Sequence, residues 1–251
     1  MSRTMRIRLS LLLAATSLVP VPARAQYLET ETARPPRAGA AQFGAAYEFQ
    51  TSSEGRETAI PLAFEYGLTS RLELLVEPVP STRILPHVGA HASGAGDLEV
   101  TLQQLLHPEA GGWPALALAG EVKIPTAKNV LIGTGRTDYA IFAIASRRIG
   151  AIDTHANVGY NILGRPAGVT LVNTISAALA ADTRVAPGFQ LFGEVLGNTS
   201  STSEAKGGDA PSAAVTPEVA GGELVGTLGF AYSPRPSFYL SLAVSSAQPA
   251  R

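Results

Sequence analysis

Apolar and polar residues alternate along eleven short stretches of this chain, and this alternation limits the fold more than any other sequence feature. In residues 152–162, even positions are mostly apolar and odd positions are mostly polar. Successive side chains of a β-strand point to opposite faces, so such a stretch forms a strand with one apolar and one polar face. Repetition of the pattern in segments of about ten residues is typical of a transmembrane β-barrel.

The predicted strands follow one another through most of the chain. Residues 139–148 are apolar on both faces, which leaves open which face meets lipid. In chain order, the strands are centred on residues 43–49, 60–66, 72–76, 98–102, 116–124, 139–148, 152–162, 169–179, 189–195, 224–232 and 238–244.

The connections between these strands alternate in length. The long ones are residues 51–57, 80–96, 125–137, 163–168 and 199–222, and the short ones are residues 67–71, 108–113, 149–151, 182–187 and 233–237. Outer-membrane barrels have short periplasmic turns and longer external loops. The alternation therefore favours an all-β, antiparallel, up-and-down transmembrane barrel over the alternative, a soluble periplasmic β-sandwich that binds a small molecule.

The N-terminus has the features of an export signal. Arg3, Arg6 and Arg8 precede an apolar core at residues 9–19, and Ala23-Arg24-Ala25 is a small-x-small cleavage site. We expect residues 1–25 to be a signal peptide that is cleaved after Ala25, because the apolar core is too short to span a bilayer as a helix. Residues 26–40 are polar and rich in proline, which predicts a flexible periplasmic lead-in.

The strand count poses a problem for closure of the barrel, which we assign to residues 41–246. Eleven strands would leave the first and last parallel, whereas single-chain bacterial barrels have an even number. An open edge in lipid leaves unpaired backbone groups that cost several kcal/mol each. We therefore expect about 12 strands in the intact form, with a closing strand missing and residues 247–251 forming a truncated stub.

Composition excludes several classes of function. The chain has no cysteine, which rules out disulfides, thiolate metal sites and a lipid anchor on an N-terminal cysteine. The net charge is −1 and no basic block occurs, so nucleic-acid binding is not expected.

If the apolar faces meet lipid, the opposite faces line the lumen. Acids dominate the resulting set, which predicts an interior that favours cations or excludes anions. The alternative is that Lys123, Arg147 or Arg148 neutralises these acids, which then fill a narrow barrel. The predicted lumen-lining residues are Glu48, Glu65, Glu73, Glu77, Glu99, Gln103, Glu121, Lys123, Asp153, His155, Asn157, Asn161, Gln190, Glu194 and Glu223.

Asp153, His155 and Asn157 lie on one face at two-residue spacing, a set that some hydrolases use. Catalysis also needs a nucleophile within hydrogen-bond reach of the imidazole, and no serine carries a recognisable signature. His87 and His91 share a loop that contains proline and glycine, so they are not spaced as helical metal ligands. We therefore expect no catalytic residue, no metal site and no cofactor.

Several segments together resemble the outer-membrane transporter-like family that is named for the meta-cleavage pathway of phenol degradation. They occur in the family's order and cover nearly all of the chain after residue 25. They are GAGDLEVTLQQLL (94–106), PALALAGEVKIPTA (114–127), GTGRTDYAIFAIASRRIGAIDTHANVGYNILG (133–164), LFGEVLGNTS (191–200) and TPEVAGGELVGTLGFAYSPRPSFYLSLAVS (216–245).

The resemblance implies a barrel in the outer membrane of a Gram-negative cell that takes up small hydrophobic or aromatic compounds. Its implied partners are outer-membrane lipid and the barrel-assembly machinery. Members of the family continue into a further strand that ends in an aromatic residue, whereas this sequence ends Gln248-Pro249-Ala250-Arg251. The alternative function is a structural or surface-interaction barrel with a closed lumen.

Overall fold

The computed structural model describes residues 6–17, 28–52, 54–201, 222–235 and 238–249. These residues contain strands, turns and loops but no helix, and so no helix that could cross a membrane. The strands are β1 (Arg6–Ser17), β2 (Ala41–Thr51), β3 (Gly55–Ile60), β4 (Leu62–Gly67), β5 (Leu72–Pro78), β6 (Ser81–Pro86), β7 (Ala92–Gly94), β8 (Leu98–His107), β9 (Ala115–Ile124), β10 (Asp138–Ile149), β11 (Ile152–Ile162), β12 (Thr174–Ala186), β13 (Phe189–Asn198), β14 (Glu223–Arg235) and β15 (Phe238–Pro249).

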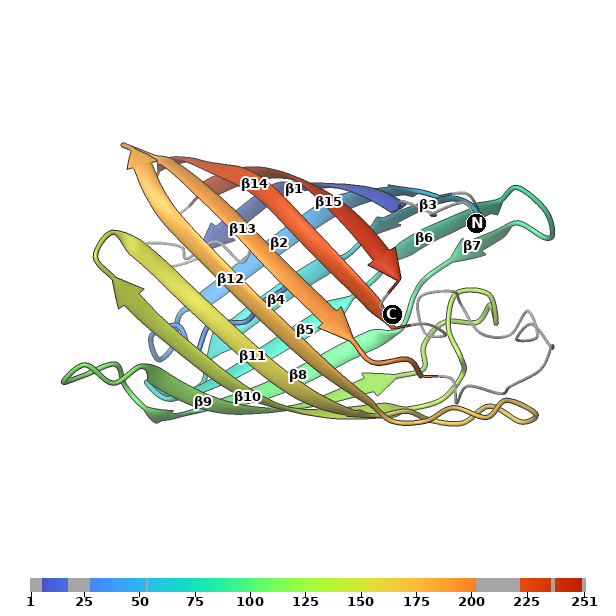
Figure 1. The fold of residues 1–251 in the computed structure, drawn as a ribbon, viewed down its shortest axis with the longest axis horizontal. Coiled ribbons are helices and arrows are strands. Elements are labelled where there is room, and N and C mark those ends of the chain that lie inside the picture. The colour runs from blue at the N-terminus through green and yellow to red at the C-terminus, as the bar shows by residue number, and fades with distance from the viewer. Residues whose placement is uncertain (1–5, 18–27, 53, 202–221, 236–237, 250–251) are drawn as a thin grey trace.

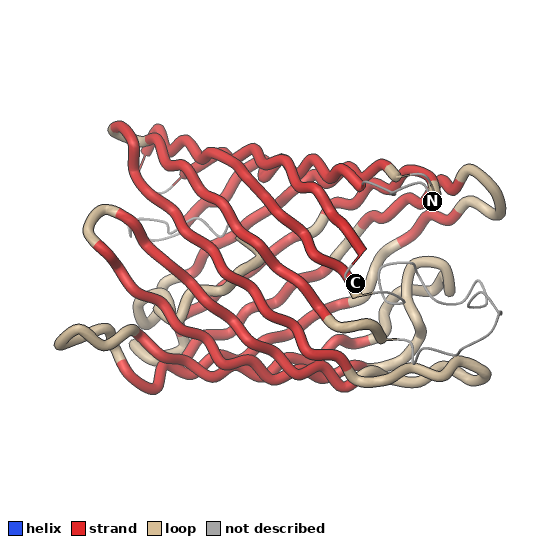
Figure 2. The backbone as a smooth tube through the Cα atoms, in the orientation of Figure 1, coloured by secondary structure: helices blue, strands red, loops and turns tan. Residues whose placement is uncertain are grey.

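All of these strands belong to one antiparallel sheet that closes on itself. Neighbours in sequence pair around the ring from β8 to β15, and β1 pairs with both β15 and β2. The strands run obliquely around the ring (Figure 1), and most of the loops and turns that join them lie at its two ends (Figure 2). The predicted fold class, an antiparallel up-and-down barrel, is therefore confirmed.

The ring has twelve strand positions among the described residues. Three of its strands are interrupted: β3 continues into β4 after Pro61, β5 into β6 after residues 79–80, and β7 into β8 after residues 95–97. The fifteen segments therefore occupy twelve positions, the number that the sequence predicted. The twelfth position is filled by β1 rather than by a strand after β15.

Strand β1 lies within the predicted signal peptide, and the cleavage site after Ala25 lies outside the described residues. The signal peptide remains a prediction. At the other end of the chain, the predicted stub is corrected in part, because residues 247–249 extend β15. Ala247 is paired with Val225 of β14 and with Arg6 of β1.

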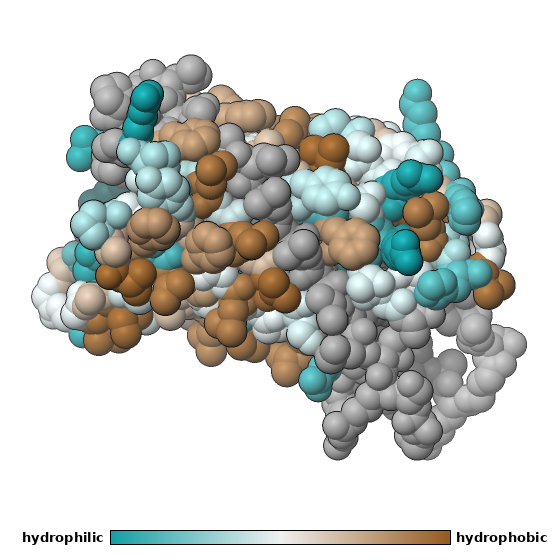
Figure 3. All heavy atoms as spheres, turned by 90° about the horizontal axis from the view of Figure 1, so that it is seen from above, coloured by the Kyte–Doolittle hydropathy of each residue, from teal (hydrophilic) through white to brown (hydrophobic). Residues whose placement is uncertain are grey.

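The apolar faces of the strands form the outer surface of the ring. Leu228 is 75% exposed and Val158 is 56% exposed, whereas Asp153 and Asn157 are buried inside. Hydrophobic side chains spread over the outer surface in Figure 3. A sandwich would bury these side chains between two sheets, so the sandwich alternative is wrong.

Strand β10, which the sequence left ambiguous, is apolar on both faces. Tyr139 and Ile141 are exposed on the outside of the ring, while Ile144 is buried inside it. The inner apolar residues contact other residues in the lumen, as described below.

Short turns join the strands at one end of the barrel, here called the tight-turn end. Gly150 in the β10–β11 turn has a φ of 63°, a left-handed conformation that glycine adopts without strain. The opposite end, the long-loop end, differs from its prediction at two connections. Residues 51–57 contain only a three-residue turn, and residues 80–96 contain β6 and β7. Strands β3, β6 and β7 pair with one another and extend this end, at the right of Figure 1.

The strand predicted at residues 169–179 is displaced along the chain. Strand β12 begins at Thr174 and continues to Ala186, so the turn predicted at 182–187 consists of Pro187 and Gly188. Residues before Thr174 bond to other loops: Val172 N–H donates to the carbonyl oxygen of Ser201 at 2.7 Å. Because of these contacts, the backbone before Thr174 does not pair with β11 as part of β12.

Candidate functional site: the barrel lumen

A stretch of chain, residues 28–36, lies inside the barrel and is here called the lumen segment. It belongs to residues 26–40, for which the sequence predicted a flexible periplasmic lead-in, and the structure corrects that prediction for its described part. Leu28 packs against Phe192 and Ala243 of the wall. Ala33 is 0% exposed and packs in the cluster that contains Ile144. The inner apolar residues of the wall therefore cover the lumen segment.

Glu194 of β13 binds the start of the lumen segment. Its Oε2 accepts hydrogen bonds from the backbone N–H of Thr30 at 3.0 Å and from the Thr30 hydroxyl at 2.9 Å. Its Oε1 accepts the N–H of Glu29 at 3.3 Å. One buried carboxylate thus satisfies two successive backbone donors, and charged acceptors make the stronger kind of hydrogen bond.

The polar face of β11 binds the next part of the lumen segment. The Asn157 amide, in the orientation that its surroundings require, accepts the N–H of Glu31 at 2.7 Å and donates to the Glu31 carbonyl oxygen at 3.0 Å. Gln103 of β8 donates to the carbonyl oxygen of Thr32 at 2.9 Å. Wall side chains therefore supply the bonds that a neighbouring strand would supply in a sheet.

Ser146, His155 and Asp182 form a chain of hydrogen bonds across three wall strands. Ser146 Oγ lies 2.8 Å from His155 Nδ1, and His155 Nε2 lies 3.3 Å from Asp182 Oδ2. The residue types are those of a hydrolase triad. However, Ser146 is 1% exposed and its oxygen already accepts the N–H of Ala33 at 2.9 Å. In this arrangement the serine binds the lumen segment rather than facing solvent.

Arg34 ends the row of contacts near the tight-turn end. Its guanidinium lies 2.8 Å from Asp153 Oδ1 and 2.5 Å from Glu109 Oε2. Arg148 donates to the other Asp153 oxygen at 2.6 Å. Two arginines and two acids thus neutralise one another in this part of the lumen.

Glu109 belongs to the β8–β9 turn, outside the membrane-spanning strands. The backbone N–H of Arg148 and then the Arg34 side chain donate to its carboxylate, and they hold the pKa of Glu109 below its ordinary value. The carboxylate therefore stays ionised and continues to hold Arg34 in mildly acidic solution.

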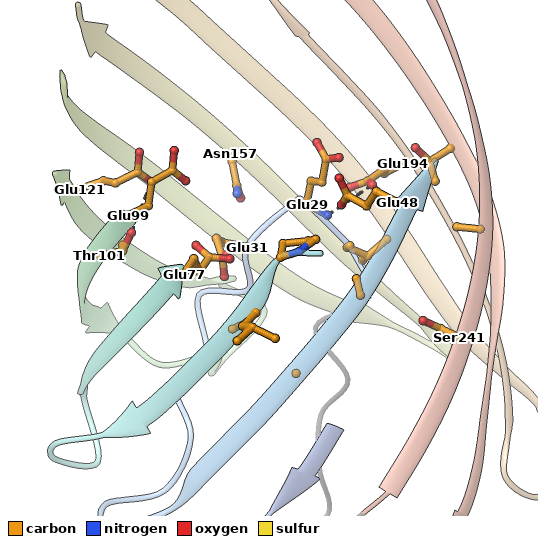
Figure 4. Close-up of a pocket in the computed structure, with 18 of the residues that line it drawn as sticks. Glu29, Glu31, Glu48, Glu77, Glu99, Thr101, Glu121, Asn157, Glu194 and Ser241 are labelled. Carbon is orange, nitrogen blue, oxygen red and sulfur yellow. Dashed lines mark hydrogen bonds between the residues drawn. The ribbon is translucent and has the colours of Figure 1, made fainter. Parts of the chain in front are cut away.

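Beyond the lumen segment, toward the long-loop end, the lumen opens into a chamber of about 410 Å³. Seven glutamates line this chamber, and no lysine, arginine or histidine is among the described residues that line it. Several of them point into the chamber in Figure 4. The glutamates are Glu29, Glu31, Glu48, Glu77, Glu99, Glu121 and Glu194.

Three of these glutamates are crowded on neighbouring strands of the wall. Glu77 of β5 is the register partner of Glu99 of β8, and Thr101 of β8 is the partner of Glu121 of β9. The Thr101 hydroxyl donates to Glu121 at 3.3 Å. Like charges directly opposite one another destabilise a sheet, so this group is not explained by stability of the wall.

The chamber also has an apolar lining. Leu28, Leu62, Phe142 and Ile144 contribute to it. The Phe142 ring lies so close to Gly159 of the next strand that a Cβ at Gly159 would be 2.5 Å from the ring. The glycine thus allows the ring to lie flat along the inner wall, and the chamber combines carboxyl groups with an apolar patch.

A smaller recess of about 190 Å³ adjoins the chamber and contains Lys123. The ammonium group of Lys123 lies 2.5 Å from Asp138 and 3.5 Å from Asp97. Lys123 is therefore held by these two aspartates, and it does not lie among the residues that line the chamber.

Of the other predicted lumen residues, Asn161 lines the smaller recess, and Glu65, Glu73, Gln190 and Glu223 lie outside both cavities. Glu73 is buried, and Gln103 Nε2 lies 3.4 Å from its carboxylate. Glu65 of β4 and Glu223 at the start of β14 are half-buried. The predicted set therefore divides into residues of the chamber, residues that bind the lumen segment, and residues at strand ends.

Sequence reasoning missed Ser146 and the whole lumen segment. Ser146 carries no motif, and residues 28–36 show no periodicity. The double apolar pattern of β10 was the available signal, because an inward apolar face in a barrel requires something apolar inside to cover it.

No protein-family model and no curated protein matches the chain. Solved structures do match over the full length. The outer-membrane protein OpdK from Pseudomonas aeruginosa is 9% identical with a TM-score of 0.36, over 99% of this chain and 98% of that chain. OccK7 (OpdD) from the same organism is 10% identical with a TM-score of 0.35, over all of both chains. The CymD monoaromatic hydrocarbon channel is 10% identical with a TM-score of 0.35, over 100% of this chain and 90% of that chain.

Proposed function

We propose that this protein is a non-enzymatic outer-membrane channel for small organic solutes with an apolar, often aromatic, body. The ring of strands with an apolar exterior supports insertion into lipid, because the outward side chains of an outer-membrane barrel are apolar. The resemblance to the phenol meta-pathway family supports the solute class. In this proposal, outer-membrane lipid and the barrel-assembly machinery are its partners, and the signal peptide is cleaved after Ala25 on export.

The single observation that carries the proposal is the chamber in the lumen. Its volume of about 410 Å³ is within the usual range of small-molecule sites, and its lining combines an apolar patch with polar groups. The apolar patch, which includes Phe142, would contact an aromatic ring. The carboxyl groups of Glu77, Glu99 and Glu121 would disfavour an anionic substituent on that ring.

The test is influx into proteoliposomes that contain the purified barrel. Benzyl alcohol, benzylamine and benzoate have similar size and differ in charge. We expect benzyl alcohol and benzylamine to enter the proteoliposomes faster than benzoate. We also expect both to enter proteoliposomes clearly faster than they enter empty liposomes. Equal influx of all three would contradict the assigned selectivity, and no influx above empty liposomes would contradict transport.

A second candidate, a structural or surface-interaction barrel with a closed lumen, is favoured by one observation. The lumen segment occupies the tight-turn half of the barrel, and the side chains around Ser146 and Ala33 are fully buried there. Planar-bilayer recordings separate the two functions, because a permanently closed barrel inserts into the bilayer without raising its conductance.

A further inference from the structure

The lumen segment is held in the barrel in a different way from every wall strand. It forms no strand, and its hydrogen bonds to the wall are made by wall side chains, including Glu194, Asn157 and Ser146. Wall strands, in contrast, are joined by continuous backbone ladders. Bonds to separate side chains can be exchanged for bonds to water one at a time, whereas a ladder breaks cooperatively.

We propose that the lumen segment is a movable plug, and that its release from the polar face of β11 opens the barrel to solutes. This inference rests on the proposed channel function and specifies how that channel is regulated. Leu28, Glu29 and Glu31 line the chamber, so the same segment separates the chamber from the tight-turn end. Solutes that reach the chamber cross the barrel only when the segment moves.

The anchor of the plug is the stretch that follows it. Gly39 N–H donates to the Gly67 carbonyl oxygen at 2.7 Å, and Gly67 N–H donates to the Ala40 carbonyl oxygen at 3.0 Å. A Cβ at Gly67 would lie 2.2 Å from the Arg37 carbonyl oxygen, so the two backbones are in close contact. Residues 37–40 therefore remain attached to the β4–β5 turn while residues 28–36 leave the wall.

The three positions on β11 act together in this proposal. Asp153 binds Arg34, His155 supports Ser146 beneath Ala33, and Asn157 binds the backbone of Glu31. The two-residue spacing places all three on the inner face of one strand. The row that resembles part of a hydrolase site is thus a docking row for an extended piece of the same chain.

The first experiment locks the plug with a disulfide. Thr32 Oγ1 and Ser146 Oγ are 3.4 Å apart, so Thr32→Cys with Ser146→Cys places two sulfur atoms within bonding reach in a chain that has no other cysteine. We expect conductance of the oxidised double variant to fall at least tenfold below that of the same protein after reduction.

The control for the lock is Ala145→Cys with Ala156→Cys. These residues are register partners of β10 and β11 on the outer face of the wall, away from the lumen segment. We expect this disulfide to leave conductance unchanged. Equal conductance of the oxidised and reduced Thr32/Ser146 variant, in a barrel that conducts, would overturn the plug.

The second experiment detects plug movement without measuring transport. In the single variant Ser146→Cys, the lumen segment covers the new thiol. Labelling of this thiol by a membrane-impermeant reagent therefore requires the segment to move. We compare this reporter with Glu194→Gln and with Glu99→Gln. Each change removes one carboxylate from the chamber lining, but only Glu194 bonds to the Thr30 backbone. We expect labelling to be about tenfold faster with Glu194→Gln, since a bond to a charged group is lost.

The two readouts separate the plug from the channel. If no variant conducts, the proposed function fails, and the labelling rates still decide the plug. Faster labelling with Glu194→Gln supports a movable segment, whereas equal rates in the two backgrounds show a fixed one and overturn the proposal.

Discussion

The two halves of the lumen accommodate their inward-facing charged side chains in opposite ways. Toward the tight-turn end, charges are paired and the lumen segment fills the space, with Arg34 between Asp153 and Glu109. Toward the long-loop end, glutamates surround an open chamber that has no cationic side chain among its described lining residues. One inward polar pattern along the strands thus produces a packed interior or an open one, depending on whether another segment enters it.

The two interpretations of the acidic interior therefore apply to different places. Neutralisation of acids by Arg148 describes the tight-turn half. The prediction of an interior that disfavours anions concerns the chamber, where the acids have no cationic neighbour among the described lining residues. Charge changes in the two halves should accordingly have different consequences, and the following substitutions test that difference.

The largest expected effect is on stability when a paired charge of the tight-turn half is removed. Asp153→Ala removes the carboxylate that pairs with both Arg34 and Arg148, and loss of one member of a buried pair costs about 3 kcal/mol. Glu99→Ala, the matched change in the chamber, relieves repulsion with Glu77 and is expected to leave stability unchanged or higher. Urea unfolding in lipid measures both, and equal losses would contradict the comparison.

A smaller loss is expected when the lumen segment loses a neutral hydrogen-bond acceptor. Ser146→Ala leaves the buried N–H of Ala33 unpaired, at a cost of about 2 kcal/mol. Ser241→Ala changes a serine of the chamber wall and is expected to cost less free energy of unfolding than Ser146→Ala, because Ser241 faces the chamber. The same unfolding measurement applies. A larger loss of stability with Ser241→Ala than with Ser146→Ala would contradict our assignment of the tightly packed half to the tight-turn end.

Ion selectivity should respond only to the chamber. We expect Glu77→Gln with Glu99→Gln and Glu121→Gln to lower the cation-to-anion permeability ratio about threefold, because the change removes the acidic side chains that favour cations in a pore lining. Asp153→Asn, below the chamber and paired with arginine, should leave the ratio unchanged. Reversal potentials in a salt gradient across a planar bilayer report both, and a shift with Asp153→Asn alone would reverse our assignment.

The smallest effect is expected at Glu109, on the edge of the paired network. Its pKa is depressed, so its contribution to stability is present above the ordinary value of 4.5 and is lost as the pH falls through the lower pKa of the folded protein. Glu109→Gln should therefore lower the thermal midpoint slightly at pH 7. Thermal unfolding from pH 7 to pH 3 measures this difference, which should shrink as the pH falls; a difference that stays constant over this range would show that charge is not its cause.

The strands of the wall were predictable because the signals that specify them lie within short stretches of the sequence. Alternation at two-residue spacing sets which side chain of β11 faces lipid, and turn residues such as Gly150 mark where the chain reverses. The prediction failed at residues 80–96, which were assigned to a long connection but contain β6 and β7. There β6 pairs with β3 despite Pro86 at its end, because that position lies at the margin of the sheet.

The contents of the lumen were not predictable in the same way because their contacts are distant in sequence. Ala33 and Ser146 are 113 residues apart, and Glu29 and Glu194 are 165 residues apart. A polar, proline-containing stretch such as residues 28–36 has no periodicity that could reveal partners so far away. The sequence identified the polar face of β11 correctly, but not what that face binds.

Strand β1 lies within the residues that cleavage after Ala25 would remove. Among the described strands, the backbone edges of β2 and β15 are joined through residues 6–17. Without these residues the two edges would stand about 10 Å apart, twice the usual distance between paired strands. If a peptidase removes the first 25 residues, the enzyme and the two edges compete for the same twelve residues. Whether cleavage or the pairing of β1 with β2 and β15 occurs first would then decide whether the barrel contains β1.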